Sequence, residues 1–450
     1  MRDIEIGEVA DAIGGELPFG GGERVIESGV STDSRSLSGT ELFVALRGER
    51  FDGHDFAQAA VDEGCPGVLL EDDAAVGEAP GTIVIEDSLL ALQRLARWWR
   101  CELGLPVVGL TGSNGKTSTK DFTKAVLAQR YSVCATQGNL NNHIGVPLSV
   151  LSLDDEHEVG VFEMGMNHPG EIAPLCEIAK PHLGIITNIG TAHIEHMGSR
   201  DGIAEEKGAL ARALPEVGTL FVPASCDYLN YLRDRTRART VAVGNGRGEV
   251  RAEEIDASGE TMKFVIVVED LGRAPVELPV AGRHMITNAL LAAAVGRELG
   301  VSLEGIVSGL MSTELTSGRL RCFESNGVRV FDDTYNANPD SMKAGLETLA
   351  EAKGERKFAV LGMMAELGEH AVREHLEVGR YAAELGVQVA SVGEEAKGIT
   401  EGASGNGVRH FDERSEAAAW LKEEVKAGDV ILFKGSRAAA IEQVMKQVFP

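Results

Sequence analysis

The stretch VVGLTGSNGKTS at residues 107–118 decides how the middle of this chain is expected to fold. A short apolar run leads into a glycine-rich turn, and the turn opens the helix-like segment TSTKDFTKAVLAQ at 117–129. In a strand–turn–helix unit of this kind, the backbone N–H groups and the helix dipole favour a bound anion. The pattern T-G-x-x-G-K-T therefore predicts a phosphate loop, in a variant where Leu110 occupies the position of the usual first glycine.

The loop residues predict how a nucleotide would be held. Lys116 is expected to reach the β- and γ-phosphates, and Thr117 to offer its hydroxyl to Mg²⁺. The other expected cofactor-binding residues of the loop are Thr111, Gly112, Ser113, Asn114, Gly115 and Ser118. The alternative interpretation of the motif is a chance glycine turn with a surface lysine. The strand expected before it and the helix expected after it argue against that alternative. Because the chain has no Asn-Lys-x-Asp guanine-binding motif, we expect ATP rather than GTP.

The alternation of short apolar runs with amphipathic helices extends on both sides of the loop. This pattern is typical of an α/β fold with mainly parallel sheets. It breaks near residue 104 and again near 314–318, which predicts three domains. They are a smaller α/β domain at 1–104, a central P-loop ATPase-type domain at 105–314 and a C-terminal Rossmann-like domain at 315–450. The helix expected at 88–103 has Ser88 as its candidate N-cap.

Composition excludes several classes of function. The 450 residues include 43 Lys and Arg against 69 Asp and Glu, a net charge of −26, so general binding to nucleic acid or to an anionic membrane is not expected. No window approaches about 20 apolar residues, so no membrane span is predicted. The N-terminus is too polar for a signal peptide. Six scattered cysteines without a C-x-x-C pair indicate reduced thiols in a cytoplasmic protein.

Metal-ligand candidates follow two expected strands. Glu163 ends the strand VGVFE, and His193 and Glu195 lie just past HLGIITNIG. In open parallel sheets, ligands bind outside the carboxyl ends of the strands, so these residues are expected to face the phosphate loop. A carboxylate and an imidazole could hold a second Mg²⁺, although a surface charge and a structural histidine remain open alternatives. Taken alone, Lys207 is expected to be a solvated helix lysine.

Further motifs lie in the same order as in the Mur ligase family, and the chain resembles that family over essentially its whole length. The matching stretches are GNLNNHIGVP at 138–147, FEMGMNH at 162–168, GRHMITNA at 282–289, SGRL at 317–320, DDTYNANP at 332–339 and FKGSR at 433–437. Two departures are Met285, where the family has Asn, and Met364, near a family G-D-M pattern.

The resemblance implies roles that spacing alone does not. Lys207 would be carbamylated by CO₂ and would hold the second Mg²⁺ together with Glu163 and His193. Asn288 would contact the adenine, and Arg319 would approach the ATP phosphates from the side opposite the loop. The implied catalytic residues are Lys116, Lys207, His193 and Arg319, the metal ligands are Thr117, Glu163, His193 and Lys207, and Asp333 joins the cofactor-binding set.

The N-terminal stretches STDSR at 31–35 and LFVALRG at 42–48 resemble the uridine-nucleotide-binding domain of two late ligases in the family. Taken without the resemblance, a polar turn before a strand is the simpler interpretation. The residues implied to bind substrate are Ser31, Asp33, Ser34, Arg35, Asn139, Tyr335 and Asn336.

The element D-D-x-Y-N-A-N-P is characteristic of the family member that attaches a D-alanyl-D-alanine dipeptide. The resemblance thus implies an ATP-dependent ligase with two Mg²⁺ ions. It would join D-alanyl-D-alanine to UDP-N-acetylmuramoyl-tripeptide through an acyl phosphate, as a cytoplasmic monomer with small-molecule substrates. Whether the tripeptide ends in lysine or diaminopimelate stays open. The alternatives are the ligase that adds the third amino acid, a folylpolyglutamate synthase relative, and an ATP-binding regulator without ligase chemistry.

Overall fold

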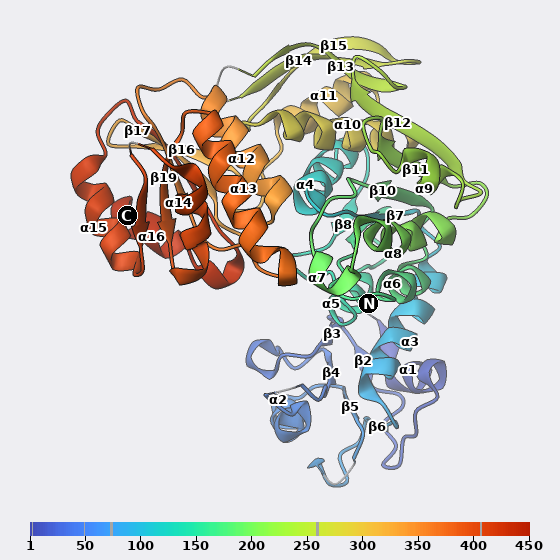
Figure 1. Ribbon diagram of the computed structural model, residues 1–450. Coiled ribbons are helices and arrows are strands. Elements are labelled where there is room, and N and C mark those ends of the chain that lie inside the picture. The colour runs from blue at the N-terminus through green and yellow to red at the C-terminus, as the bar shows by residue number, and fades with distance from the viewer. Residues whose placement is uncertain (2, 49, 73–74, 258–260, 406) are drawn as a thin grey trace.

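The computed structural model describes residues 1–450 except 2, 49, 73–74, 258–260 and 406. Among the described residues, three larger sheets with helices packed against them follow one another along the chain, and the expected α/β class is confirmed. In Figure 1 the N-terminal sheet lies at the bottom, the central sheet above it and the C-terminal sheet to one side, coloured orange and red. Among the described residues, no helix is both long enough and apolar enough to cross a membrane.

The N-terminal unit is a parallel four-stranded sheet in the order β3-β4-β5-β6, beside a small antiparallel pair β1-β2. Its strands are β1 (Ile4–Glu5), β2 (Val25–Ile26), β3 (Val30–Ser31), β4 (Leu42–Val44), β5 (Gly67–Leu70) and β6 (Thr82–Val84). Its helices are α1 (Ile6–Ile13), α2 (Ala57–Glu63) and α3 (Ser88–Leu103).

Helix α3 leads from the N-terminal unit to the central one. The N-cap residue of α3 differs from the one expected from the sequence. Asp87, not Ser88, is the N-cap, because the Asp87 carboxylate accepts a hydrogen bond from the Leu90 N–H at 2.8 Å. Ser88 is already helical, and its N–H donates to the Glu71 carboxylate at 3.0 Å. The prediction of Ser88 as the cap was therefore wrong by one residue.

The central unit is a nine-stranded sheet in the order β15-β14-β13-β12-β11-β10-β7-β9-β8. Its strands are β7 (Val107–Thr111), β8 (Val133–Ala135), β9 (Val159–Glu163), β10 (Leu183–Ile186), β11 (Thr219–Pro223), β12 (Arg239–Asn245), β13 (Val250–Asp256), β14 (Met262–Val268) and β15 (Gly272–Leu278). Neighbours from β8 to β13 pair in parallel, whereas β13, β14 and β15 form an antiparallel edge.

The helices of the central unit are α4 (Lys116–Leu127), α5 (Gly145–Leu151), α6 (Ile172–Ala179), α7 (Ile194–Met197), α8 (Arg200–Ala213), α9 (Leu229–Arg233), α10 (Arg283–Glu298) and α11 (Leu303–Met311). Every residue of β7 is buried, as befits a central parallel strand covered on both faces. Its position fixes the glycine-rich turn between β7 and α4 at the carboxyl edge of the sheet.

The C-terminal unit has six strands in the order β16-β17-β21-β18-β19-β20, all parallel except β16. They are β16 (Arg321–Ser325), β17 (Val328–Asp333), β18 (Lys357–Leu361), β19 (Gln388–Val392), β20 (Arg409–Phe411) and β21 (Val430–Lys434). The helices are α12 (Pro339–Glu351), α13 (Ala371–Glu384), α14 (Lys397–Ala403), α15 (Arg414–Glu424) and α16 (Glu442–Val448).

Two apolar cores join the three units. One runs from Phe122 of α4 through Leu291 of α10 to Leu346 of α12, and so links the central and C-terminal units. The other links Leu42 of β4 to Phe162 of β9, across the N-terminal boundary. Fully burying one such side chain stabilises a fold by about 1.5–3 kcal/mol, so these shared cores hold the sheets in a defined arrangement.

Candidate functional site

The turn between β7 and α4 depends on two glycines that lie against neighbouring side chains. A Cβ on Gly112 would lie 1.8 Å from the Thr187 hydroxyl oxygen. Gly115 has a φ of +77° and is the N-cap of α4, and a Cβ there would lie 2.7 Å from the Asn288 amide oxygen. Both glycines are therefore required for the backbone to pass this closely. The turn exposes the first N–H groups of α4, which have no partner within the helix.

The segment after β10 holds this turn in place. The Asn114 N–H donates to the Asn188 side-chain oxygen at 2.8 Å, and the Thr187 hydroxyl donates to the Asn114 carbonyl at 2.5 Å. The Lys116 ammonium folds back to the Gly112 carbonyl at 2.8 Å. Burial lowers the pKa of Lys116, while the Glu163 carboxylate opposes that shift. The lysine is thus positioned at the loop with a charged partner across it.

A polar network connects β9 to the loop. The Glu163 carboxylate, 2% exposed, accepts hydrogen bonds from the Thr117 hydroxyl at 3.0 Å and from the Asn141 amide at 2.8 Å. The Arg319 guanidinium donates to the Thr117 hydroxyl oxygen at 3.2 Å. A hydroxyl and a carboxylate side by side are oxygen donors of the kind that Mg²⁺ prefers.

His193 is the N-cap of α7 and faces Glu366 of the C-terminal unit. It adopts the left-handed conformation, with φ 62°, and its Nδ1 lies directly beside the Glu366 carboxylate. The adjacent His193 ring lowers the pKa of Glu366. The Glu195 N–H also donates to the Glu366 carbonyl, at 3.3 Å. Glu366 therefore fixes both the ring and the backbone of the His193 turn.

Lys207 lies inside the protein rather than on a solvated helix face, so the expectation from sequence alone was wrong. Lys207 is only 1% exposed. The pKa of Lys207 lies well below its ordinary value because burial disfavours the charge and Lys116 repels it. The neighbouring Glu206 is occupied elsewhere, since its carboxylate accepts the N–H groups of Gly170 and Ile172.

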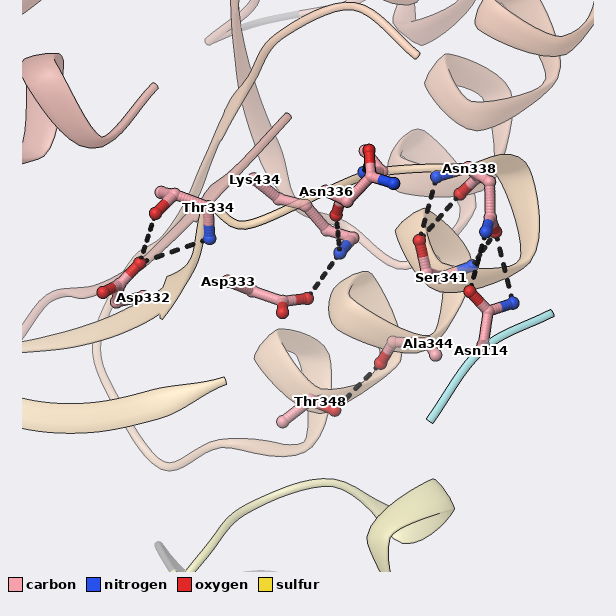
Figure 2. A network of polar contacts seen from close by, with 11 residues as sticks. Asn114, Asp332, Asp333, Thr334, Asn336, Asn338, Ser341, Ala344, Thr348 and Lys434 are labelled. Atoms are coloured by element: carbon pink, nitrogen blue, oxygen red, sulfur yellow. Dashed lines mark hydrogen bonds and ion pairs between the residues drawn. The ribbon is translucent and has the colours of Figure 1, made fainter. Parts of the chain in front are cut away.

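The ends of β17 and β21 bring a second group of polar residues to the same place (Figure 2). The buried Lys434 ammonium donates to the Asp333 carboxylate at 2.6 Å and to the Asn336 carbonyl at 3.0 Å. The Arg319 guanidinium carbon lies 3.9 Å from the centre of the Tyr335 ring. The Arg319 Nε is buried and has no hydrogen-bond partner among the described residues, so its N–H can donate to a ligand.

Two contacts connect the C-terminal unit to the loop region directly. The side chains of Asn114 and Asn338 exchange hydrogen bonds of 2.7 and 3.3 Å, visible at the right of Figure 2. The Asp340 carboxylate accepts the N–H and the hydroxyl of Thr191, at 2.9 and 3.0 Å. These bonds hold the first turn of α12 against the loop and against the turn that carries His193.

A cavity of about 1010 Å³ lies between the central and C-terminal units. Of the residues predicted from the sequence, the structure brings together Ser113, Asn114, Gly115, Lys116, Thr117, Ser118, Asn139, Glu163, His193, Asn288, Arg319, Asp333, Tyr335 and Asn336 on its wall. Thr111, Gly112 and Lys207 lie behind that wall, in β7, at the start of the loop and in α8.

The four predicted substrate residues of the N-terminal unit do not line this cavity. Ser31 ends β3, and Asp33, Ser34 and Arg35 form a compact turn after it. The Asp33 carboxylate accepts the Arg35 N–H at 3.0 Å and pairs with its guanidinium at 2.6 Å, which lowers the pKa of Asp33 to about 2. All four residues are half-buried or exposed.

Sequence reasoning assigned no role to several residues that shape the site. Asn141, Asn338 and Lys434 fell within motifs already noticed, so their presence was visible but their contacts were not. Asn188 lay in the stretch HLGIITNIG and Glu366 two residues after Met364, but each contacts a residue far away along the chain, so these contacts were not predicted. The Met285 sulfur, at the position of the family's Asn, accepts from the Asn288 amide at 3.6 Å.

Comparisons with known proteins agree along the whole chain. Three family models match: Mur ligase family, catalytic domain, at residues 28–97; Mur ligase middle domain at 110–296; and Mur ligase, glutamate ligase domain, at 318–437. The chain is 37% identical to the UDP-N-acetylmuramoyl-tripeptide--D-alanyl-D-alanine ligase of Escherichia coli (strain K12), over 99% of this chain and 98% of the relative. It is 36% identical to the ligase of the same name from Bacillus subtilis (strain 168), over 98% and 97%.

Solved structures give the same result for the fold. A crystal structure of MurF from Acinetobacter baumannii superposes with a TM-score of 0.91 at 34% identity, covering 100% of this chain and 99% of that chain. The structure of MurF ligase from Thermotoga maritima in complex with ADP gives a TM-score of 0.84 at 30% identity, covering 93% and 96%.

Proposed function

The chain belongs to the Mur ligase family, and from this premise we propose that it joins D-alanyl-D-alanine to UDP-N-acetylmuramoyl-tripeptide in peptidoglycan precursor synthesis. The reaction is ATP-dependent and forms ADP and phosphate. The two relatives that match over nearly the whole chain both carry the name of this ligase. Neither carries the name of another ligase of the family or of an ATP-binding regulator.

One observation supports the proposal above the others. The phosphate loop of the central unit and the D-D-x-Y-N-A-N-P element of the C-terminal unit line one cavity, joined by the Asn114–Asn338 pair. A ligase of this kind must bring a phosphoryl donor, a carboxylate and an amine together, and such positioning lowers the barrier by removing the entropy cost of their encounter. A site shared by two units can do this when each unit carries a different substrate.

The charges around the loop suit transfer of a γ-phosphoryl group to a substrate carboxylate. The carboxylate is a poor electrophile until its oxygen becomes part of an acyl phosphate, which an amine can attack with loss of phosphate. Lys116 lies against the Gly112 carbonyl and Arg319 donates to the Thr117 hydroxyl, and each can stabilise negative charge on the phosphoryl oxygens. The unpartnered buried Nε of Arg319 fits a phosphate oxygen as its acceptor.

The donor set also fits two Mg²⁺ ions, which when bound neutralise phosphate charge and polarise the carboxylate. Thr117 and Glu163 supply the oxygen ligands next to the loop. His193, Glu163 and Lys207 would supply a second set. An unmodified lysine is a weak ligand for a hard cation, so this second set is complete only if Lys207 carries a carboxylate.

Lys207 has the environment that such a modification needs. A lowered pKa makes the Lys207 amine easier to deprotonate, and the lone pair of the deprotonated amine can attack CO₂. A nitrogen–carbon bond forms, one proton is released, and the amine becomes a carbamate anion. We propose that Lys207 is carbamylated in the active protein.

The three units suit three substrates. We assign the nucleotide end of the UDP-linked substrate to the N-terminal unit at 1–104, with Ser31, Asp33, Ser34 and Arg35 as its contacts. ATP is assigned to the central unit at 105–314, with Asn288 beside the adenine and Asn139 toward the peptide. The dipeptide is assigned to the C-terminal unit at 315–450, with Asp333, Tyr335 and Asn336 facing the cavity.

We further propose that the protein works as a monomer in the cytoplasm. All six cysteines are free, which suits a reducing compartment, and ATP is available there. Light scattering of the purified chain with and without ATP tests the monomer, and fractionation of cells expressing it tests the location.

The reaction itself is tested by measuring phosphate release with ATP and Mg²⁺. Release should require both UDP-N-acetylmuramoyl-tripeptide and D-alanyl-D-alanine, and mass spectrometry should find the joined pentapeptide product. Tripeptides ending in lysine or in diaminopimelate, compared side by side, identify the natural substrate. Nucleotide binding without product from either tripeptide would contradict the proposal.

A further inference from the structure

A second cluster of metal-ligating side chains lies in the C-terminal unit, away from the cavity. Glu394 follows β19, and His410 and Asp412 lie in and just after β20, at the edge of the sheet. One ligand atom from each of the three lies within 4.8 Å of the others, and none of the three lines the cavity between the units. We propose that these three residues bind a divalent first-row metal ion such as Zn²⁺.

The backbone brings the three donors together at the carboxyl ends of two neighbouring parallel strands. His410 and Asp412 are two residues apart on an extended segment, so their side chains leave the same face. The Gly393 N–H donates to the Phe411 carbonyl at 2.9 Å, which ties the residue before Glu394 to the residue between the other two. The arrangement is thus built by strand pairing.

Hydrogen bonds from outside the cluster fix which nitrogen of His410 is free. The Thr400 hydroxyl donates to the Lys397 carbonyl at 2.8 Å, so the Thr400 oxygen is left to accept from the Ser391 hydroxyl, 3.2 Å away. The Ser391 oxygen, in turn, is left to accept from His410 Nδ1 at 2.8 Å. On this basis we assign the hydrogen to Nδ1, the arrangement usual for a metal-binding histidine oriented by a second contact.

This leaves His410 Nε2 facing carboxylates. Nε2 lies 3.1 Å from an Asp412 oxygen, and two atoms without a hydrogen between them attract only if a positive charge lies between them. A proton on Nε2 would satisfy Asp412 alone, whereas a divalent ion would satisfy Asp412, Glu394 and the ring together. Ligands bound to one Zn²⁺ at about 2.0–2.2 Å lie roughly 3–3.5 Å apart, which suits the observed separation.

The chemistry of the donors selects the kind of ion. One imidazole and two carboxylates, with solvent available to complete the shell, suit Zn²⁺ and its neighbours better than Mg²⁺, which favours oxygen ligands alone. The Asp412 side chain is 74% exposed, so an ion can enter without rearrangement of the fold. The site rests on the C-terminal unit alone and is independent of the proposed ligase reaction.

The test is calorimetric titration of the metal-free full-length chain with Zn²⁺, in wild type and variants. His410→Ala and Asp412→Asn should each lose one equivalent of bound Zn²⁺. Ser391→Ala should keep the three ligands but weaken that equivalent about 10- to 100-fold, because the ring loses its orienting acceptor. His157→Ala is the matched control, since His157 pairs with a single carboxylate, Asp154, and should leave binding unchanged.

Zinc can also bind elsewhere, including at the catalytic ligands, so the difference between wild type and variant is the decisive quantity. Equal stoichiometry and equal dissociation constants in wild type, His410→Ala and Asp412→Asn would overturn the site and indicate a simple histidine–aspartate ion pair. Circular dichroism of each variant shows whether it is folded. If His410→Ala does not fold, Asp412→Asn, at an exposed position, still tests the site.

Discussion

Asn338, the N-cap of α12, and Asn114, in the phosphate loop, exchange two side-chain amide hydrogen bonds of 2.7 and 3.3 Å across the boundary between two units. Asn338 also accepts the Ser341 N–H and so begins its own helix. One side chain therefore couples the start of a C-terminal helix to the loop expected to hold ATP. The position of the C-terminal unit and the shape of the loop depend on each other.

Replacing Asn338 by Ala should weaken that coupling. The loss of a cap and of two hydrogen bonds is worth about 1–2 kcal/mol, which corresponds to a roughly 5- to 30-fold fall in kcat/KM if closure precedes catalysis. Steady-state kinetics with all three substrates measure the change. Asn338→Asp is the matched control, because it keeps the cap and one bond with Asn114. Equal kinetics in Asn338→Ala and wild type would show that the contact does not serve the reaction.

Gly112→Ala should disrupt the phosphate loop. The new Cβ would lie 1.8 Å from the Thr187 hydroxyl oxygen, which itself holds the Asn114 carbonyl. Overpacking of this kind costs about 1–3 kcal/mol, and here the loop must shift to relieve it. The thermal midpoint should fall, and stabilisation by ADP should be lost. Gly244→Ala is the control, because its Cβ would find only ordinary contacts, the nearest at 3.4 Å.

His375 should make stability depend on pH. Its Nε2 accepts the Met364 N–H at 3.0 Å and its Nδ1 donates to the Ala371 carbonyl, so the folded protein needs the neutral ring. Burial lowers the pKa of His375 below its ordinary value of 6.5. At pH values between the folded and the unfolded pKa of His375, the unfolded chain binds more protons than the folded chain. The contribution of His375 to stability is therefore complete above pH 6.5 and is lost as the pH falls through the folded pKa.

The measurement is thermal unfolding of wild type and His375→Gln between pH 7.5 and pH 5.5. Gln can accept the Met364 N–H but does not titrate, so the midpoint of the variant should fall less steeply with acid. His143→Gln, at an exposed position, should keep the wild-type slope. Parallel curves for wild type and His375→Gln would contradict the assignment.

The local parts of the structure could be predicted from the sequence because their signals are local. The apolar run of β7, the glycine turn and the amphipathic pattern of α4 lie within about twenty residues, and all three elements form as expected. The order of the strands, by contrast, depends on pairing between distant segments. The antiparallel edge formed by β13, β14 and β15 was not anticipated for this reason.

The contacts that complete the site are long-range, and for that reason the sequence did not reveal them. Glu366 meets His193 from another unit, and Asn188 meets the phosphate loop from the next strand. Lys207 is the sharpest case. Helical spacing alone suggested a solvated side chain, and only the packing of α8 shows that it is buried.

Lys207→Ala should reduce ligase activity by at least about a hundredfold, the usual effect of removing one group that stabilises charge in a transition state. Carbon-13 NMR of the wild-type chain under ¹³CO₂ should show a carbamate signal that Lys207→Ala lacks. Lys446→Arg is the control, because Lys446 is exposed and lies in α16, so its replacement leaves the surroundings of Lys207 intact. Undiminished activity in folded Lys207→Ala would remove the second metal set from the mechanism.

Asn336→Ala should separate binding of the dipeptide from binding of ATP. The Asn336 carbonyl accepts the Lys434 ammonium and its side-chain oxygen accepts the Ala337 N–H, so the side-chain amide N–H groups remain for the cavity. Alanine keeps the backbone contact and removes those donors. Since a hydrogen bond contributes about 0.5–1.5 kcal/mol, KM for D-alanyl-D-alanine should rise roughly 2- to 13-fold while KM for ATP stays constant. Asn336→Asp retains the acceptor but not the donors, so it should behave like alanine. If rate and dipeptide KM were unchanged in both variants, Asn336 would hold the loop only through its backbone, and another residue would have to recognise the dipeptide.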